Sequence, residues 1–175
     1  MTEPELRQAF EDHKDSVYDF ALRMTGSEAV AEDVAQDCFL ELLRNPRGFD
    51  RTRGSLRTFL FGVTRHLVYR QWRNSQRLVP VDGLFEDELG SYSPDLTSGS
   101  TATIVREAVQ ALPALQREAV LLFEYEGFTL EEIASIANVD VGTVKSRLHR
   151  AREKLRQVLA PLRNHTGVQH TGAKQ

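Results

Sequence analysis

The chain contains a single cysteine, Cys38, among its 175 residues, so it cannot form an internal disulfide. Its five histidines are scattered, without the spacing of a zinc site. We therefore interpret Cys38 as a small buried apolar residue and expect neither a metal nor another cofactor. No stretch approaches the roughly 20 apolar residues that span a bilayer, and the N-terminus has no signal-peptide pattern. These absences predict a cytoplasmic protein without direct membrane insertion.

Groups that could carry out catalysis are also lacking. The sequence shows no cluster of carboxylates, no nucleophile beside a base, no glycine-rich phosphate loop and no set of metal ligands. The chain is therefore expected not to be an enzyme. A hydrophobic fraction of 41% and a charged fraction of 27% are typical of globular proteins and indicate no particular function.

The charges are arranged in blocks that the net charge of −3 conceals. Residues 1–43 hold eleven acids and three bases, whereas residues 44–77 hold nine arginines and one acid, Asp50. A second basic block, residues 143–163, holds seven bases and one acid, Glu153. Basic patches attract phosphates even on an anionic protein, so two nucleic-acid-binding surfaces are predicted. Either block alone is also typical of a solvated helix face.

Apolar residues recur at helical spacing nearly everywhere, and no run alternates in the manner of a β-strand, so the predicted fold class is all-α. Gly26 is expected to end the first helix, and Ser27 to cap the second. Predicted helices cover about residues 5–24, 28–45, 56–76, 103–112 and 113–125, followed by two more. The third helix is predicted to bury a stripe made of Leu56, Leu60, Val63 and Leu67.

Residues 77–102 lose this periodicity and gather glycine, serine, proline and acids. Such a composition predicts a flexible acidic linker between two small helical domains, residues 1–76 and 103–163. The remaining segment, residues 164–175, is expected to be a disordered tail.

The second predicted domain contains a helix-turn-helix. Thr129 and Glu132 have the spacing of a capping box, and Phe128 and Ile133 the spacing of a hydrophobic staple. A second cap follows at Asp140, so only residues 138–140 separate the two helices. The last helix should bury Val144, Leu148, Ala151, Leu155 and Val158.

The start of that last helix has a basic outer face, which favours insertion into a DNA major groove. A surface helix rich in arginine is the plainer alternative. Glu153 would repel phosphates and should lie beyond the groove. The residues predicted to contact DNA are Thr143, Lys145, Ser146, Arg147, His149 and Arg150.

Three motifs in this half, LPALQRE at 112–118, GFTLEEIA at 127–134 and GTVKSRLHRAR at 142–152, closely resemble the C-terminal domain of extracytoplasmic-function (ECF) sigma factors. In the first half, AEDVAQDCFL at 31–40 resembles the polymerase-binding helix of the same family. The resemblance implies a region 2-like helical bundle and a region 4-like helix-turn-helix. It also implies promoter DNA, core RNA polymerase and an anti-sigma factor as partners.

By this resemblance, one polar face of the 31–40 helix docks on the clamp region of core polymerase. Taken without the family, such a face is more typical of ordinary solvent exposure, because acidic helix faces are common. The residues expected on it are Asp33, Gln36, Asp37 and Glu41.

The resemblance further implies that the loop of residues 49–55 captures an unpaired base of the minus-ten element, while the third helix supports strand opening. Arginine and aromatic side chains share one stripe of that helix. The arginines can bind phosphates, and the aromatic rings can stack on exposed bases. Trp72 is equally consistent with a core position. The sequence departs from the family pattern at Phe59, His66 and Arg70, which can change minus-ten specificity. The predicted contacts are Arg51, Arg53, Ser55, Arg65, Tyr69, Trp72 and Arg73.

The same resemblance assigns the minus-thirty-five duplex to the helix-turn-helix. A second class of protein remains open at this stage, a helix-turn-helix regulator that works without polymerase and uses its first half to bind a ligand or dimerise. Tight duplex binding in the absence of polymerase would favour it.

Overall fold

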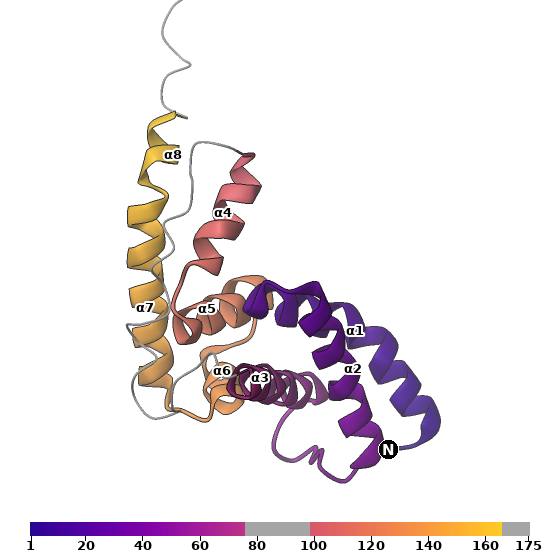
Figure 1. Cartoon of the computed structure of the whole chain (residues 1–175). Helices are drawn as coiled ribbons and strands as arrows, with labels where there is room; N and C mark the ends of the chain where they lie inside the picture. Colours follow the sequence, from indigo (N-terminus) through magenta and orange to yellow (C-terminus); the bar gives the residue numbers. More distant parts are fainter. Residues whose placement is uncertain (76–98, 166–175) are drawn as a thin grey trace, which may run out of the picture.

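The computed structural model describes residues 1–75 and 99–165, and within these ranges every regular element is helical (Figure 1). The all-α prediction is confirmed. The elements are α1 (Glu3–Thr25), α2 (Glu28–Arg44), α3 (Leu56–Asn74), α4 (Thr101–Gln110), α5 (Ala114–Val120), the π-helix η1 (Leu121–Tyr125), α6 (Leu130–Ala137), α7 (Val141–Val158) and α8 (Ala160–His165). The predicted linker and tail lie almost wholly outside the described residues.

Side-chain caps explain where the helices begin. Ser27 accepts a hydrogen bond from the Val30 amide, as predicted, and Gly26 ends α1 with a left-handed φ of 68°. The first helix starts earlier than expected because Thr2 and Glu5 form a capping box. Each cap satisfies an amide that the first helical turn leaves without a partner.

The first three helices form a bundle around a core that contains Phe20, Met24, Leu42 and Leu60. Cys38 is fully buried there, as expected, and burial raises the pKa of its thiol to about 11. The predicted α3 stripe is only partly correct. Leu60 and Leu67 are buried, whereas Leu56 and Val63 are half-buried. Val63 lines a surface pocket, and the face turned inward also includes Phe61, Thr64 and Val68.

The second half folds as α4 to α8, with α6 and α7 forming the helix-turn-helix. The capping box at Thr129 and Glu132 and the cap at Asp140 are both present. Asn138 takes a left-handed φ of 53° that ends α6 and turns the chain toward α7. Of the predicted buried residues on α7, Leu155 and Val158 are only half-buried. They lie in the later part of α7, where α4 is the neighbouring helix (Figure 1).

The two halves contact one another directly. In Figure 1, α3 lies beside α6, and α5 lies near the C-terminal end of α1. The rings of Phe61 on α3 and Phe128 before α6 meet edge to face, with centroids 4.9 Å apart. Buried apolar residues of both halves thus belong to one continuous cluster. We call this docked arrangement of the halves the closed form.

Two kinds of feature are absent from the described residues. No helix among them is long and apolar enough to cross a membrane. No group of three or more histidine, cysteine, aspartate or glutamate side chains in those ranges is arranged to hold a metal ion.

Candidate nucleic-acid interface

The acidic face of α2 points away from the bundle core. Asp33, Gln36 and Glu41 are exposed, and they alternate with buried residues such as Val34 and Cys38. Asp37 is the least exposed of the four predicted residues, with 41% of its side chain accessible. Its carboxylate lies 3.0 Å from a guanidinium nitrogen of Arg70 on α3. This face is accessible to a partner. One of its acids, Asp37, already forms an ion pair with Arg70 of α3.

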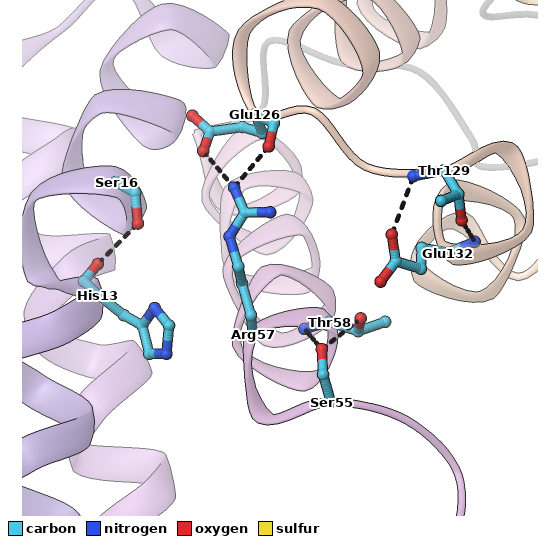
Figure 2. A network of polar contacts seen from close by, with 8 residues as sticks. All are labelled: His13, Ser16, Ser55, Arg57, Thr58, Glu126, Thr129 and Glu132. Atoms are coloured by element: carbon cyan, nitrogen blue, oxygen red, sulfur yellow. Dashed lines mark hydrogen bonds and ion pairs between the residues drawn. The ribbon is translucent and has the colours of Figure 1, made fainter.

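The loop between α2 and α3 is held by its own side chains. The Asp50 carboxylate accepts hydrogen bonds from the hydroxyl and the backbone amide of Thr52, at 2.7 and 2.9 Å. These bonds lower the pKa of Asp50. Ser55 caps α3 by accepting the Thr58 amide at 3.0 Å (Figure 2). Arg51 pairs with Glu5 on α1 at 2.9 Å. Ser55 therefore has a structural role in addition to any contact with DNA.

Beside this loop lies a pocket of about 550 Å³ that opens to solvent. Phe49 and Phe59 line it with their rings 5.6 Å apart, and Arg53, His66 and Arg70 bring basic groups. Three of its lining residues, Phe59, His66 and Arg70, are the positions at which the sequence departs from the ECF pattern. A Cβ atom added to Gly62 would meet no atom within 4 Å, so the floor is unobstructed at that point. Ser135 and Ile136 of α6 complete the wall in the closed form.

The predicted stripe on α3 is partly covered by the second half. The Arg65 Nε lies 2.9 Å from both oxygens of Glu118 on α5, and the Tyr69 hydroxyl donates to Glu118 at 2.8 Å. Glu118 is only 1% exposed, whereas 22% of the Arg65 side chain is exposed. Burial opposes the charged form of Arg65, but the adjacent carboxylate outweighs it and raises the pKa of Arg65. Sequence reasoning missed Glu118, whose partners are about fifty residues away.

The other two residues of that stripe, Trp72 and Arg73, differ in their exposure. Trp72 is half-buried and meets Tyr69 edge to face at 5.1 Å, so its ring packs against the bundle. Arg73 is exposed at the end of α3. Burial, followed by the nearby Glu118 charge, raises the pKa of Tyr69 well above its usual value. The phenol thus stays neutral and donates to the Glu118 carboxylate.

At the helix-turn-helix, most of the predicted DNA contacts lie on one accessible surface. Lys145, Ser146, His149 and Arg150 are exposed, and Thr143 is half-buried. The Asp140 carboxylate accepts the Thr143 amide at 2.7 Å, and this bond lowers the pKa of Asp140. The fold and this surface define a DNA-binding protein of the helix-turn-helix class.

Two other residues of α7, Arg147 and Glu153, do not share this accessible surface. Arg147 is half-buried, and its buried Nε makes no hydrogen bond. Glu153 forms an ion pair with Arg156 on the distal part of α7, beyond the proposed DNA-contacting segment. The position of Glu153 agrees with a contact surface confined to the first turns of the helix, whereas Arg147, a predicted contact within those turns, is only partly accessible.

Comparisons with known proteins identify the family. A model of Sigma-70 region 2 matches residues 9–78, and a model of Sigma-70, region 4 matches residues 102–155. The ECF RNA polymerase sigma factor EcfG of Rhodopseudomonas palustris is 37% identical over 146 residues, covering 80% of this chain and 77% of the relative. The ECF RNA polymerase sigma factor SigL of Mycobacterium tuberculosis is 32% identical and covers 90% of each chain. The chain belongs to the ECF RNA polymerase sigma factors.

A solved structure agrees with this assignment. The sigma factor RpoE of Bartonella quintana, in complex with the anti-sigma factor NepR, superposes with a TM-score of 0.71 at 29% identity. The match covers 89% of this chain and 97% of that one. The predicted pair of region 2-like and region 4-like domains is thereby confirmed. Members of the family are transcription initiation factors, which confirms the prediction that the chain is not an enzyme.

Proposed function

We propose that this sigma factor directs promoter-specific initiation through three separate surfaces. In this scheme, residues 1–76 bind core RNA polymerase and the minus-ten element, and residues 103–163 bind the minus-thirty-five element. Residues 77–102 link the two units, and residues 164–175 form a tail. The protein works in the cytoplasm, where polymerase and promoter DNA are found.

The observation that carries this proposal is the pocket beside the loop of residues 49–55. Enzymes and factors that act on an unstacked base hold it in a pocket by ring contacts and by hydrogen bonds to its edge. The pocket offers both, since Phe49 and Phe59 supply rings while Arg53 and His66 supply donors. Its volume of about 550 Å³ lies within the usual range for sites that bind small ligands. An unpaired minus-ten base is the ligand that fits a member of this family.

Duplex recognition is assigned to the first turns of α7. Arg150 and Lys145 lie on its exposed face with Ser146 and His149, and arginine contacts guanine edges through two parallel hydrogen bonds. The Asp140 carboxylate caps this end of the helix by accepting the Thr143 amide. Phosphate contacts by the same basic residues would hold the register along the duplex.

The exposed acids of α2 are proposed to dock on a basic surface of the polymerase clamp. Complementary charge raises association rates and orients partners, so a face with Asp33, Gln36 and Glu41 exposed suits this role. We also propose that an anti-sigma factor binds this chain, because its solved relative was crystallised with one.

Reconstitution with purified core polymerase tests the function. The protein should confer initiation from specific sites in a library of promoter fragments, with start positions mapped by sequencing the transcripts. Failure to bind core would contradict the proposal. Tight, specific duplex binding without polymerase, combined with no effect on initiation, would instead support a polymerase-independent regulator.

A matched pair of substitutions at Gly62 tests the pocket. Gly62→Leu adds a side chain at a point where the floor is open, so it should obstruct an incoming base and sharply reduce promoter opening. Gly62→Ala is the control, because it improves helix propensity and leaves most of the pocket free. Binding to core polymerase should be equal for both variants. Equal promoter opening by both would argue against base capture here.

A further inference from the structure

Three side chains of the pocket proposed to hold a base have hydrogen-bonding groups that the protein does not use. Glu41 of α2, Arg53 of the loop and His66 of α3 all line the pocket and are exposed. In the part of the chain that the structure describes, no ion pair or side-chain hydrogen bond engages any of the three. We call them the reading residues. Their donors and acceptors are available to a ligand from three different elements.

Two other charged groups of the pocket are already engaged. The Asp50 carboxylate accepts hydrogen bonds from Thr52, and the Arg70 guanidinium lies 3.0 Å from the carboxylate of Asp37. These bonds hold both side chains in place. Asp50 and Arg70 therefore shape the wall, and the reading residues are left to meet the ligand.

Phe49 and Phe59 supply the apolar surface of the pocket. Both are half-buried, and their rings are 5.6 Å apart with planes inclined by 50°. Rings at this separation touch one another, so a base lies against them and does not enter between them. Stacking on a ring is tolerant of sequence because every base has a π-face. The rings thus hold a base without choosing it, and the choice falls to the reading residues.

Guanine matches the reading residues at two of its edges. Its O6 and N7 atoms are neighbouring acceptors, which suit the N–H donors of arginine and histidine. Its N1–H and N2 amino groups are neighbouring donors, which suit a carboxylate because an ionised carboxylate only accepts. Arg53 and His66 can serve the first edge, and Glu41 can serve the second.

The other bases fail at one of these edges. Adenine carries an amino group in place of O6 and an acceptor at N1, so it would set a donor against Arg53 and a lone pair against Glu41. Cytosine and thymine arrange their donors and acceptors along a single edge, so they cannot serve both sets of groups. A polar group left without a partner in a site built for hydrogen bonding is the basis of strong selectivity.

We propose that the reading residues make guanine the preferred unpaired base of the minus-ten element. Arg53 and His66 donate to O6 and N7, and the Glu41 carboxylate accepts from N1–H and the N2 amino group. Glu41 thus reads a base in addition to lying on the proposed docking face of α2. His66 is one of the positions at which the sequence departs from the ECF pattern, so the preference belongs to this chain. The inference rests on the proposed function, which supplies base capture in this pocket.

Single-stranded oligonucleotides test the preference with the full-length chain. Fluorescent thymidine oligomers would carry one central guanine, adenine or cytosine, and anisotropy would measure their binding. The guanine oligomer should bind at least about fivefold more tightly than the others, including plain oligothymidine. Two analogues separate the edges, since hypoxanthine lacks only the N2 amino group of guanine and 7-deazaguanine lacks only N7. Each should lose part of the gain.

Two substitutions assign the edges to residues. Glu41→Gln should reduce the preference for guanine over hypoxanthine, because the carboxylate that meets the N2 amino group is lost, while the effect of 7-deazaguanine remains. His66→Ala should show the opposite pattern. Glu32→Gln is the matched control for Glu41→Gln, since it makes the same charge change at an exposed position of α2 that does not line the pocket. Each readout is a ratio between oligomers for one variant, so a general loss of DNA affinity cancels.

Reconstituted initiation separates this inference from the proposed function. A promoter found with core polymerase would carry the same base replacements at each minus-ten position, and its opening would be measured. Guanine preference in the oligomers without any initiation would support base reading and contradict the proposed function. If guanine is preferred in neither assay, the inference is wrong whether or not the protein initiates transcription. It is also wrong if Glu41→Gln and Glu32→Gln keep the same preference for guanine over hypoxanthine.

Discussion

The Asp37 carboxylate on α2 lies 3.0 Å from a guanidinium nitrogen of Arg70 on α3. The pair joins the proposed polymerase-binding face to the wall of the pocket, because Arg70 also lines that pocket. Both side chains are more than two-fifths exposed, so the pair contributes at most about 1 kcal/mol to stability. Its main effect is to fix the position of two groups that we assign to different partners.

Asp37→Ala should weaken binding to core polymerase while duplex binding by the second domain stays intact. The reason is the loss of one negative charge from a docking face that favours basic partners. Fluorescence anisotropy with labelled protein and purified core polymerase would measure the change, which we expect to be about fivefold to tenfold at low salt.

Arg70→Ala is the matched control, since it breaks the same ion pair from the other side. It should leave core affinity close to that of the wild type and alter promoter opening instead. If Arg70→Ala weakened core binding as much as Asp37→Ala, the acid would act through Arg70 and not by direct contact.

Arg150→Ala should reduce discrimination between correct and altered minus-thirty-five sequences by about 1–3 kcal/mol. Arg150 lies on the exposed face of α7 that we assign to the major groove. Competition binding with duplexes altered at single base pairs would measure the loss. Arg156→Ala, further along α7 and paired with Glu153, should lower affinity uniformly or not at all. Equal loss of discrimination in both variants would contradict the assigned reading surface.

Arg117→Ala should lower the free energy of unfolding by about 3 kcal/mol, because hydrogen bonds from charged groups contribute about 1.5–3 kcal/mol and several are lost. Arg117 donates to the carbonyls of Met24, Gln110 and Leu112, and burial lowers its pKa. Urea denaturation followed by circular dichroism would measure the difference. Arg106→Ala, at an exposed position of α4, should change stability by less than about 0.5 kcal/mol.

Asp140→Ala should lower the melting temperature at neutral pH because α7 loses its N-terminal cap. The folded protein lowers the pKa of Asp140, so the stabilisation is present above the ordinary aspartate range and is lost as the pH falls through the lower folded value. Melting curves of the wild type and the variant should therefore converge in strong acid. Asp140→Asn keeps an uncharged cap and should show a difference from Asp140→Ala that does not vary with pH.

The helices and the helix-turn-helix could be predicted from local patterns. Caps at Ser27, Thr129 and Asp140 act within a few residues, so their geometry follows from the order of side chains along the chain. The π-helix η1 was not predicted, because it differs from α-helix by one hydrogen-bond register and carries no signal in apolar spacing. The acidic face of α2 was correctly predicted as a shared polar face, since residues three and four apart are neighbours on a helix.

By itself, the sequence determined an all-helical protein with two basic surfaces, an acidic helix and the motifs of its family. These properties depend on spacing and charge over short stretches. Only the tertiary structure decided that Glu118 would meet Arg65 and Tyr69, that three unusual residues would share one pocket, and that Arg117 would cap α1. Such contacts join residues tens of positions apart, and their geometry depends on how the helices of both halves pack together.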